Sequence, residues 1–285
     1  MGLFVGFVTV IGALVGGLWL SGFLFLRRYS RLVPPERRAD CLAAGERLLA
    51  AARGSVLVFA AHPDDVEYWL GGTLPRLAQR GVQVHVVLAT RGERGGRRPD
   101  LGRVRTAEQE RAGAILGYHR IIWLDLPDRG VKVTPELVAR LRALLDEVQP
   151  SLVFTFDADK PLPPYVHPDH QAVGRAGCMA FADWAGSRDG ARLCLFHTRR
   201  PNTLIDVQST AELKRAAFAA HESQHGPPRP ALRMVLTLLR WLFPNAQARG
   251  EEDTVEVLCC PDGAPAADAR LEDGERRSAR DNHPH

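Results

Sequence analysis

The chain of 285 residues lacks the features by which proteins usually bind nucleic acids. It has no lysine-rich arm and no basic stripe with interleaved aromatic residues. The formal net charge is only +4, because the many arginines are scattered among acidic residues. This pattern argues against nucleic-acid binding, since such proteins gather their positive charge on one face or along one helix.

Cysteines are few. There are five, and two of them, Cys259 and Cys260, are adjacent. This number and spacing do not indicate a disulfide framework, so we expect reduced cysteines, as in the cytoplasm. We predict that Cys178 and Cys194 are small packing residues in the core.

Charged residues are absent from Gly2 to Leu26. A run this long can cross a bilayer, because about 20 apolar residues span the hydrocarbon core. No Lys or Arg precedes the run, and it is longer than the apolar centre of a cleaved secretory signal. We therefore predict a transmembrane helix over residues 1–28. The arginines that follow it, Arg27, Arg28 and Arg31, predict a single-pass membrane protein whose catalytic domain is cytoplasmic.

Beyond this segment, apolar runs typical of buried parallel strands alternate with helical patterns. We expect strands at 55–61, 82–89, 121–124, 152–156 and 193–197, and helices at 40–53, 67–80, 106–116, 134–148 and 169–184. The alternation predicts an α/β fold with an open, mostly parallel sheet and helices on both faces, preceded by one N-terminal transmembrane helix. In such sheets, ligands bind beyond the carboxyl ends of the strands, where the strand order reverses.

Two histidine motifs follow the first and fourth expected strands. They are HPDD at 62–65 and HPDH at 167–170. Those strands would be neighbours across the reversal in a doubly wound sheet, so we expect the motifs to meet in one crevice. Together they supply three histidines and three carboxylates, enough for a metal with an open position and an acid/base pair beside it. Helix-cap and turn roles would explain the aspartates but not the histidines.

Within the motifs, we predict that His62, Asp65 and His170 are metal ligands. Two imidazoles and one carboxylate form a facial set that leaves room for water and substrate. Zn²⁺ suits this mixed set, and Fe²⁺ fits it as well. Such an ion lowers the pKa of bound water to about 7. Asp64, adjacent to a ligand, is predicted to be the general base that accepts the proton of this water.

Two further residues of the second motif have predicted roles. His167 would lie on the far side of the substrate carbonyl, where its protonated ring would stabilise the oxyanion and then protonate the leaving nitrogen. Asp169 is predicted to orient a histidine ligand through a hydrogen bond.

Several strings occur in a fixed order from about Val56 to Gln224: AHPDDVE, GGTL, TRGERGG, HPDHQAVGRA and KRAAFAAHESQ. On these strings the chain resembles the PIG-L/LmbE-like N-acetylglucosaminyl deacetylases. The resemblance implies a Rossmann-like fold and a zinc-dependent hydrolase that removes acetyl from an N-acetylglucosamine (GlcNAc) unit. The roles that the resemblance implies are the same as those inferred above from chemistry. His62, Asp65 and His170 would be the metal ligands, Asp64 the base and His167 the residue that stabilises the oxyanion.

By the same resemblance, Glu93, Arg105 and Tyr165 match positions near the sugar and are predicted to bind substrate. For Glu93 and Arg105 the alternative is a solvated loop charge. His221 lies in a stretch similar to the family but not at a metal position, so we expect a structural role.

The likeness ends near residue 226. Pro230–Pro244 encloses an apolar helical pattern, which is typical either of a core helix or of a helix on the membrane surface. The polar residues 262–285 predict a disordered tail. The expected organisation is therefore an anchor (1–28), a deacetylase domain (29–261) and a tail (262–285).

These features lead us to expect a membrane-anchored, metal-dependent deacetylase. Its substrate would be a GlcNAc-containing small molecule or glycolipid, and the anchor favours a lipid-linked one. Two alternatives remain: a hydrolase of another amide, such as a thiol-sugar conjugate, and a non-catalytic membrane scaffold with a vestigial pocket. The presence of Asp64 favours an enzyme over the scaffold.

Overall fold

The computed structural model describes residues 32–162, 166–185, 190–226 and 254–261. Four sequence predictions concern residues outside these ranges. They are the anchor over 1–28, the helix within Pro230–Pro244, the tail over 262–285 and the substrate contact of Tyr165.

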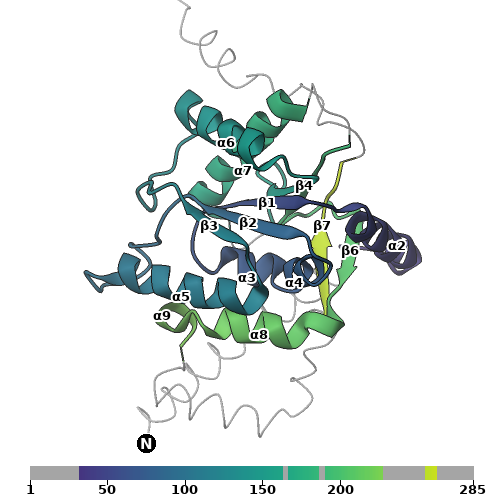
Figure 1. The fold of residues 1–285 in the computed structure, drawn as a ribbon, viewed down its shortest axis with the longest axis horizontal. Coiled ribbons are helices and arrows are strands. Elements are labelled where there is room, and N and C mark those ends of the chain that lie inside the picture. Colours follow the sequence, from purple (N-terminus) through teal and green to yellow (C-terminus); the bar gives the residue numbers. More distant parts are fainter. Residues whose placement is uncertain (1–31, 163–165, 186–189, 227–253, 262–285) are drawn as a thin grey trace, which may run out of the picture.

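A five-stranded, all-parallel sheet forms the centre of the molecule (Figure 1). Its order is β3-β2-β1-β4-β5, with β1 (Ser55–Ala60), β2 (Gln83–Leu88), β3 (Arg120–Trp123), β4 (Leu152–Phe156) and β5 (Arg192–Phe196). The strand order reverses between β1 and β4, whose pairing matches Val56 with Leu152 and Val58 with Phe154. The predicted α/β class, the strand positions and the pairing of the first and fourth strands are confirmed.

Helices cover both faces of this sheet (Figure 1). One face carries α6 (Pro135–Val148) and α7 (Pro168–Ala185). The other carries α3 (Asp65–Leu70), α4 (Thr73–Ala78), α5 (Leu101–Leu116) and α8 (Ala211–Ala219), followed by the short α9 (Glu222–His225). The N-terminal α2 (Pro35–Ala51) packs beside a two-stranded antiparallel sheet of β6 (Thr203–Asp206) and β7 (Val255–Leu258), and a short 3-10 helix (Gln208–Thr210) precedes α8.

The helix predicted over 67–80 is two short helices instead. Gly71 and Gly72 separate them. A Cβ at Gly72 would lie 2.4 Å from the Cβ of Val207, so only glycine permits this close approach. The pairing of β6 with β7 was not predicted, because β7 belongs to the region beyond the family likeness.

The helix over 134–148 forms as predicted. The Thr134 hydroxyl accepts a hydrogen bond from the backbone N–H of Leu137, and Pro135 occupies the first turn. Its predicted apolar face is buried: Leu137, Leu141, Leu144 and Leu145. This face covers the sheet beside α7.

No helix in the described ranges has the length and apolar character needed to cross a bilayer. On this finding we correct the predicted localisation. The assignment as a single-pass membrane protein with a cytoplasmic domain is withdrawn, as is the membrane partner. Length and lack of charge in residues 2–26 were its only basis, and that segment lies outside the described residues.

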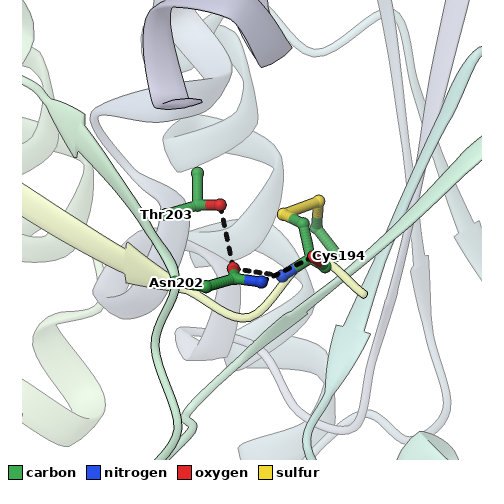
Figure 2. The surroundings of a disulfide bond; sticks show 4 residues. Cys194, Asn202 and Thr203 are labelled. Atoms are coloured by element: carbon green, nitrogen blue, oxygen red, sulfur yellow. Dashed lines mark hydrogen bonds between the residues drawn. A yellow bond between two sulfur atoms is a disulfide. The ribbon is translucent and has the colours of Figure 1, made fainter. Parts of the chain in front are cut away.

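A disulfide joins Cys194 on β5 to Cys260, 66 positions further along the chain (Figure 2). The prediction of reduced cysteines is therefore wrong for this pair, and Cys194 is more than a packing residue. The backbones of Leu195 and Cys259 exchange two hydrogen bonds of 2.8 Å, which brings the end of β7 onto the edge of β5. The side chain of Asn202 also donates to the carbonyl of Cys260 and accepts from its N–H. The pairing could not be read from spacing because it depends on this strand contact.

β7 also carries a buried carboxylate. Glu256 accepts hydrogen bonds of 2.8 Å from the backbone N–H groups of Gly72 and Thr73, at the start of α4. Its other contact is an ion pair of 2.6 Å with Lys214 on α8. A carboxylate in this position satisfies helix N–H groups that would otherwise be buried without acceptors. The last described strand thus supports two helices of the main body.

Removing the disulfide should destabilise the fold. We expect Cys194→Ala to lower the free energy of unfolding by roughly 2–4 kcal/mol, because a cross-link over a loop of this length restricts the unfolded chain. Urea denaturation with and without reductant measures this. Reductant should destabilise the wild type and leave Cys194→Ala unchanged, while Cys178→Ala, which removes a free thiol, should keep the response to reductant. Labelling of all five cysteines in the folded wild type without reductant would contradict the disulfide.

Candidate active site and metal centre

The first motif forms a tight turn between β1 and α3. The carboxylate of Asp65 accepts hydrogen bonds from the backbone N–H groups of His62 at 2.7 Å and Ala61 at 3.2 Å, so it closes the turn on itself. Asp64 adopts a left-handed backbone conformation with φ +87° and ψ −23°. Non-glycine residues rarely adopt this conformation, and when they do they are concentrated at functional sites.

The second motif opens α7 directly beside this turn. Pro168 begins the helix, and the ring of His170 stacks on Phe156 at the end of β4, with centroids 4.2 Å apart. A Cβ at Gly174 would lie 2.6 Å from the carbonyl oxygen of Phe156, so glycine lets the helix approach the strand this closely. The end of β4 thus fixes the position of His170.

The three predicted ligands converge on one point. His62 Nδ1 lies 3.3 Å from His170 Nε2 and 3.5 Å from Asp65 Oδ2, and His170 Nε2 lies 3.1 Å from Asp65 Oδ1. In a tetrahedral Zn²⁺ site with ligands about 2.0–2.1 Å from the ion, ligand atoms lie roughly 3.3–3.4 Å apart. The donor set therefore fits a small divalent cation in both chemistry and spacing. Asp65 contacts the two rings through different oxygens. With one ligand atom from each residue, the groups of described side chains that could hold an ion are His62, His167 and His170, and His62, Asp128 and Asp169.

The second nitrogen of His62 faces two buried carboxylates. Its Nε2 lies 3.1 Å from Asp169 Oδ2 and 3.2 Å from Asp128 Oδ1. Asp169 is held in turn by the backbone N–H groups of Arg129 and Val131. Metal-binding histidines usually donate their other N–H to a carboxylate in this way. The contact is the one that the predicted role of Asp169 requires.

These contacts set the charge of the buried cluster. Burial disfavours the protonated form of His62, but hydrogen bonds to Asp128 and Asp169 and the nearby Asp65 outweigh it and raise its pKa well above the ordinary value. Burial would raise the pKa of Asp65, yet His170 and His62 hold it well below its usual range. For Asp128, His62 and the N–H of Arg94 outweigh burial and lower the pKa to about 2. The site thus holds ionised carboxylates, as cation binding requires.

Sequence reasoning missed Asp128. It is 3% exposed and lies in the loop after β3, and the carboxylate of Glu93 accepts its backbone N–H at 2.8 Å. A signal was available, because this loop also leaves the carboxyl end of a parallel strand, where ligands bind. Glu93, predicted to bind substrate, is an exposed residue that supports this loop.

The second residue predicted to contact sugar, Arg105, is buried in protein contacts. Its guanidinium donates to the carbonyl oxygens of Gly92 and Pro63 and lies 3.3 Å from the carboxylate of Asp64. At 4% exposure it is not a solvated loop charge. Its contacts with Pro63 and Asp64 indicate that it supports the turn that carries Asp64.

His167 lies beside the converging ligands, with its ring centroid 4.8 Å from that of His62. Its Nδ1 accepts a hydrogen bond from the backbone N–H of Asp169 at 3.2 Å, which assigns the ring proton to Nε2 in the neutral form. Burial, together with the nearby His62 and His170, lowers the pKa of His167. That direction works against the protonated ring expected from the sequence, but the neutral ring still offers an Nε2–H donor.

The other histidines in the described ranges are not among the predicted ligands, although the ring centroid of His197 lies 6.0 Å from that of His170. His221 is fully buried, with Nε2 3.3 Å from a carboxylate oxygen of Glu67, in agreement with the structural role expected for it. Nε2 of His197 donates to the carbonyl oxygen of Leu162, and His85 packs against His119. His225 contacts Asp64 and had not been singled out in the sequence.

The family model for PIG-L, GlcNAc-PI de-N-acetylase, matches residues 57–181, a range that contains both motifs. A diacetylchitobiose deacetylase of Thermococcus kodakarensis is 31% identical over 189 residues, covering 59% of this chain and 69% of that protein. A 1D-myo-inositol 2-acetamido-2-deoxy-alpha-D-glucopyranoside deacetylase of Actinosynnema mirum is 30% identical over 251 residues, covering 77% of this chain and 86% of that protein. The chain belongs to the PIG-L family. The predicted family and the prediction of an N-deacetylase are confirmed.

Solved structures agree with this assignment. N,N'-diacetylchitobiose deacetylase from Pyrococcus horikoshii superposes with a TM-score of 0.62 over 86% of this chain and 97% of its own, at 24% identity, which shows a shared fold. The conserved protein TT1542 from Thermus thermophilus is 28% identical, with a TM-score of 0.55 over 73% of this chain and 94% of its own. The PIG-L fold thus extends well beyond the residues matched by the family model.

The contact between His62 and Asp169 should tune metal affinity. Asp169→Asn keeps the shape of the side chain but removes its charge, so we expect Zn²⁺ to bind about 10–100-fold more weakly. Competition with a chromophoric chelator measures the dissociation constant. Asp159→Asn, at an exposed carboxylate of a different loop, is the matched control and should bind as the wild type does. Equal affinity in Asp169→Asn and wild type would contradict the role of this contact.

Proposed function

We propose that the chain is a metal-dependent hydrolase that removes the acetyl group from the GlcNAc unit of a small conjugate. The observation that carries the proposal is the mutual spacing of 3.1–3.5 Å among the donor atoms of His62, Asp65 and His170, directly beside Asp64. Relatives named as deacetylases of diacetylchitobiose, of a GlcNAc-inositol and of GlcNAc-malate support it. Their substrates share the acetylated sugar and differ in the attached group.

We infer Zn²⁺ as the ion, held by His62, Asp65 and His170. Two nitrogens and one oxygen suit it, although Fe²⁺ fits the same ligand types. When bound, such a cation supplies a water of lowered pKa and an electrophilic partner for a carbonyl oxygen. Three buried carboxylates, those of Asp65, Asp128 and Asp169, gather around the single ring of His62, and a bound cation would offset the part of their negative charge that the ring does not balance.

Asp64 is the proposed general base. It accepts a proton from water while the oxygen of that water bonds to the acetyl carbonyl carbon. The C–N bond then breaks, acetate leaves, and the sugar nitrogen takes up a proton. Among the described residues, no protein group hydrogen-bonds with Oδ1 of Asp64, so this oxygen is available for the water.

His167 is the proposed donor to the carbonyl oxygen. Its Nε2–H would stabilise the negative charge that develops on this oxygen as water adds. The hydrogen bond from the Asp169 N–H to Nδ1 orients the ring for this task. The neutral ring is sufficient, because a neutral imidazole N–H also polarises a carbonyl group.

We propose that residues 29–261 form the domain that carries this activity. The support comes from β7, whose Glu256 contacts α4 and α8 and whose end is linked to β5 through Cys260. A shorter domain ending at α9 would leave the N–H groups at the start of α4 without their acceptor.

The proposed activity predicts a dependence on metal. The purified full-length chain should release acetate from N,N'-diacetylchitobiose with about one Zn²⁺ bound per chain. A chelator should abolish turnover, and added Zn²⁺ should restore it, with Fe²⁺ as the comparison under anaerobic conditions. Elemental analysis and acetate release measure the two quantities together. Turnover that persists after complete removal of metal would refute the proposal.

Asp64→Asn should separate metal binding from catalysis. The variant should hold as much Zn²⁺ as the wild type, because Asp64 is not among the proposed ligands. Its turnover should fall about 10²–10⁴-fold, since a positioned base contributes that much. His119→Leu, which changes an exposed side chain beside β3, is the control and should turn over normally. Wild-type turnover in Asp64→Asn would rule out the assigned base.

A further inference from the structure

The carboxylate of Asp64 is held from one side only. His225, the last residue of α9, places its Nε2 3.0 Å from Oδ2 of Asp64. The guanidinium of Arg105 lies 3.3 Å from the same oxygen. One carboxylate oxygen is therefore held by two nitrogen donors, while Oδ1 has no hydrogen-bonding partner among the described residues. Because an ionised carboxylate only accepts, the contact assigns a proton to Nε2 of His225.

The backbone of Asp64 is fixed separately. Its N–H donates to the side-chain oxygen of Gln109 at 3.3 Å, and Arg105 donates to the carbonyl oxygen of Pro63. Gln109 is in turn held by Glu67, which accepts from its amide at 2.7 Å. These bonds maintain the left-handed conformation, which is unfavourable for a residue with a Cβ. These backbone contacts do not fix the rotation of the Asp64 carboxylate. That rotation depends on His225 and Arg105, which contact Oδ2.

A contact with the buried carboxylate of Glu108 holds the helix that carries His225 in place. Glu108 on α5 is 3% exposed, and its two carboxylate oxygens accept from the backbone N–H and the hydroxyl of Ser223, at 2.7 and 2.6 Å. This pair fixes α9 against α5. The ring of His225 also stacks on Phe218 of α8, with centroids 4.1 Å apart. A histidine held by these contacts reaches Asp64 in a defined orientation.

One face of α5 thus organises the base. Arg105, Glu108 and Gln109 are spaced so that they share a face of the helix. Arg105 contacts the carboxylate of Asp64, Gln109 contacts its backbone, and Glu108 fixes α9, which carries His225.

We propose that His225 is a positioning residue of the active site, which holds Oδ2 of Asp64 and so presents Oδ1 to the reacting water. The inference rests on the proposed function, in which Asp64 is the base. His225 acts through Asp64 and is not among the proposed metal ligands, since its contact is with Oδ2 of Asp64. A base displaced by about 1 Å can cost up to 10²-fold in rate, so the orientation has a measurable effect.

The test compares two substitutions in the full-length, Zn²⁺-loaded chain, with N,N'-diacetylchitobiose as the substrate. His225→Leu removes the donor nitrogen and should lower kcat about 10–100-fold, with KM changed less than about 3-fold. His225→Gln places an amide N–H near the position of Nε2 and should recover most of the lost kcat. Both variants should bind about one Zn²⁺ per chain and unfold at the temperature of the wild type to within a few degrees.

Ser223→Ala gives an independent test of the same contact, because it loosens α9 without touching His225. It should lower kcat in the same direction by a smaller factor, and it carries the test if His225→Leu does not fold. His119→Leu is the control and should match the wild type.

Wild-type kcat in His225→Leu would overturn the positioning role and leave the proposed function intact. A loss of kcat in His225→Leu that is accompanied by loss of metal would also overturn the positioning role. The same holds if kcat is lost in His225→Leu and His225→Gln does not recover it. A metal-loaded wild type that releases no acetate would instead overturn the proposed function, and this inference with it.

Discussion

The parallel pairing of β1 with β4 brings together two motifs that lie about a hundred residues apart in the chain. Each strand ends at the same edge of the sheet, so the turn after β1 and the start of α7 face one another there. The ring of His62 lies between them, with one nitrogen toward Asp65 and His170 and the other toward Asp128 and Asp169. A change in the register of this pair of strands would separate the donor atoms, whatever the residues themselves.

The arrangement of side chains around His62 follows from the charge that is buried there. Three buried carboxylates surround one histidine, and a buried charge without a counter-charge costs several kcal/mol. Backbone N–H groups from the loops after β2 and β3 satisfy part of this demand at Asp128 and Asp169. The ring of His62 and the cation that we propose between His62, Asp65 and His170 would balance the remainder. Asp128 and Asp169, which these N–H groups hold, also keep the ring of His62 in one orientation. The same hydrogen bonds therefore stabilise the buried charge and fix the position of the ring.

Much of the site could be predicted because it is local. Each four-residue motif follows an apolar run, and the chemistry of histidine and aspartate indicates a metal. The alternation of strands and helices predicted that the first and fourth strands would be neighbours, and the residues around Thr134 predicted its cap. Other parts depend on contacts between distant segments. Gln109 and His225 carry no local pattern, and their relevance is visible only once α5 and α9 lie beside the turn at Asp64.

The cysteines show the same limit. Cys194 and Cys260 pair because the end of β7 lies on β5, and no rule of spacing predicts a strand that itself lacks family likeness. The predicted membrane localisation failed for a related reason. It rested on composition alone, and no described helix meets the requirement for crossing a bilayer.

The position of Glu256 has a consequence for how the protein is made. The N–H groups at the start of α4 and the ammonium group of Lys214 emerge from the ribosome long before their shared acceptor does. Elements near the N-terminus generally fold first during synthesis. In the nascent chain these groups therefore stay hydrated, or are bound by a chaperone, until β7 has been translated and Glu256 is available as their acceptor. The contacts of α4 and α8 with Glu256, and the disulfide between Cys194 and Cys260, are then among the last native contacts to form.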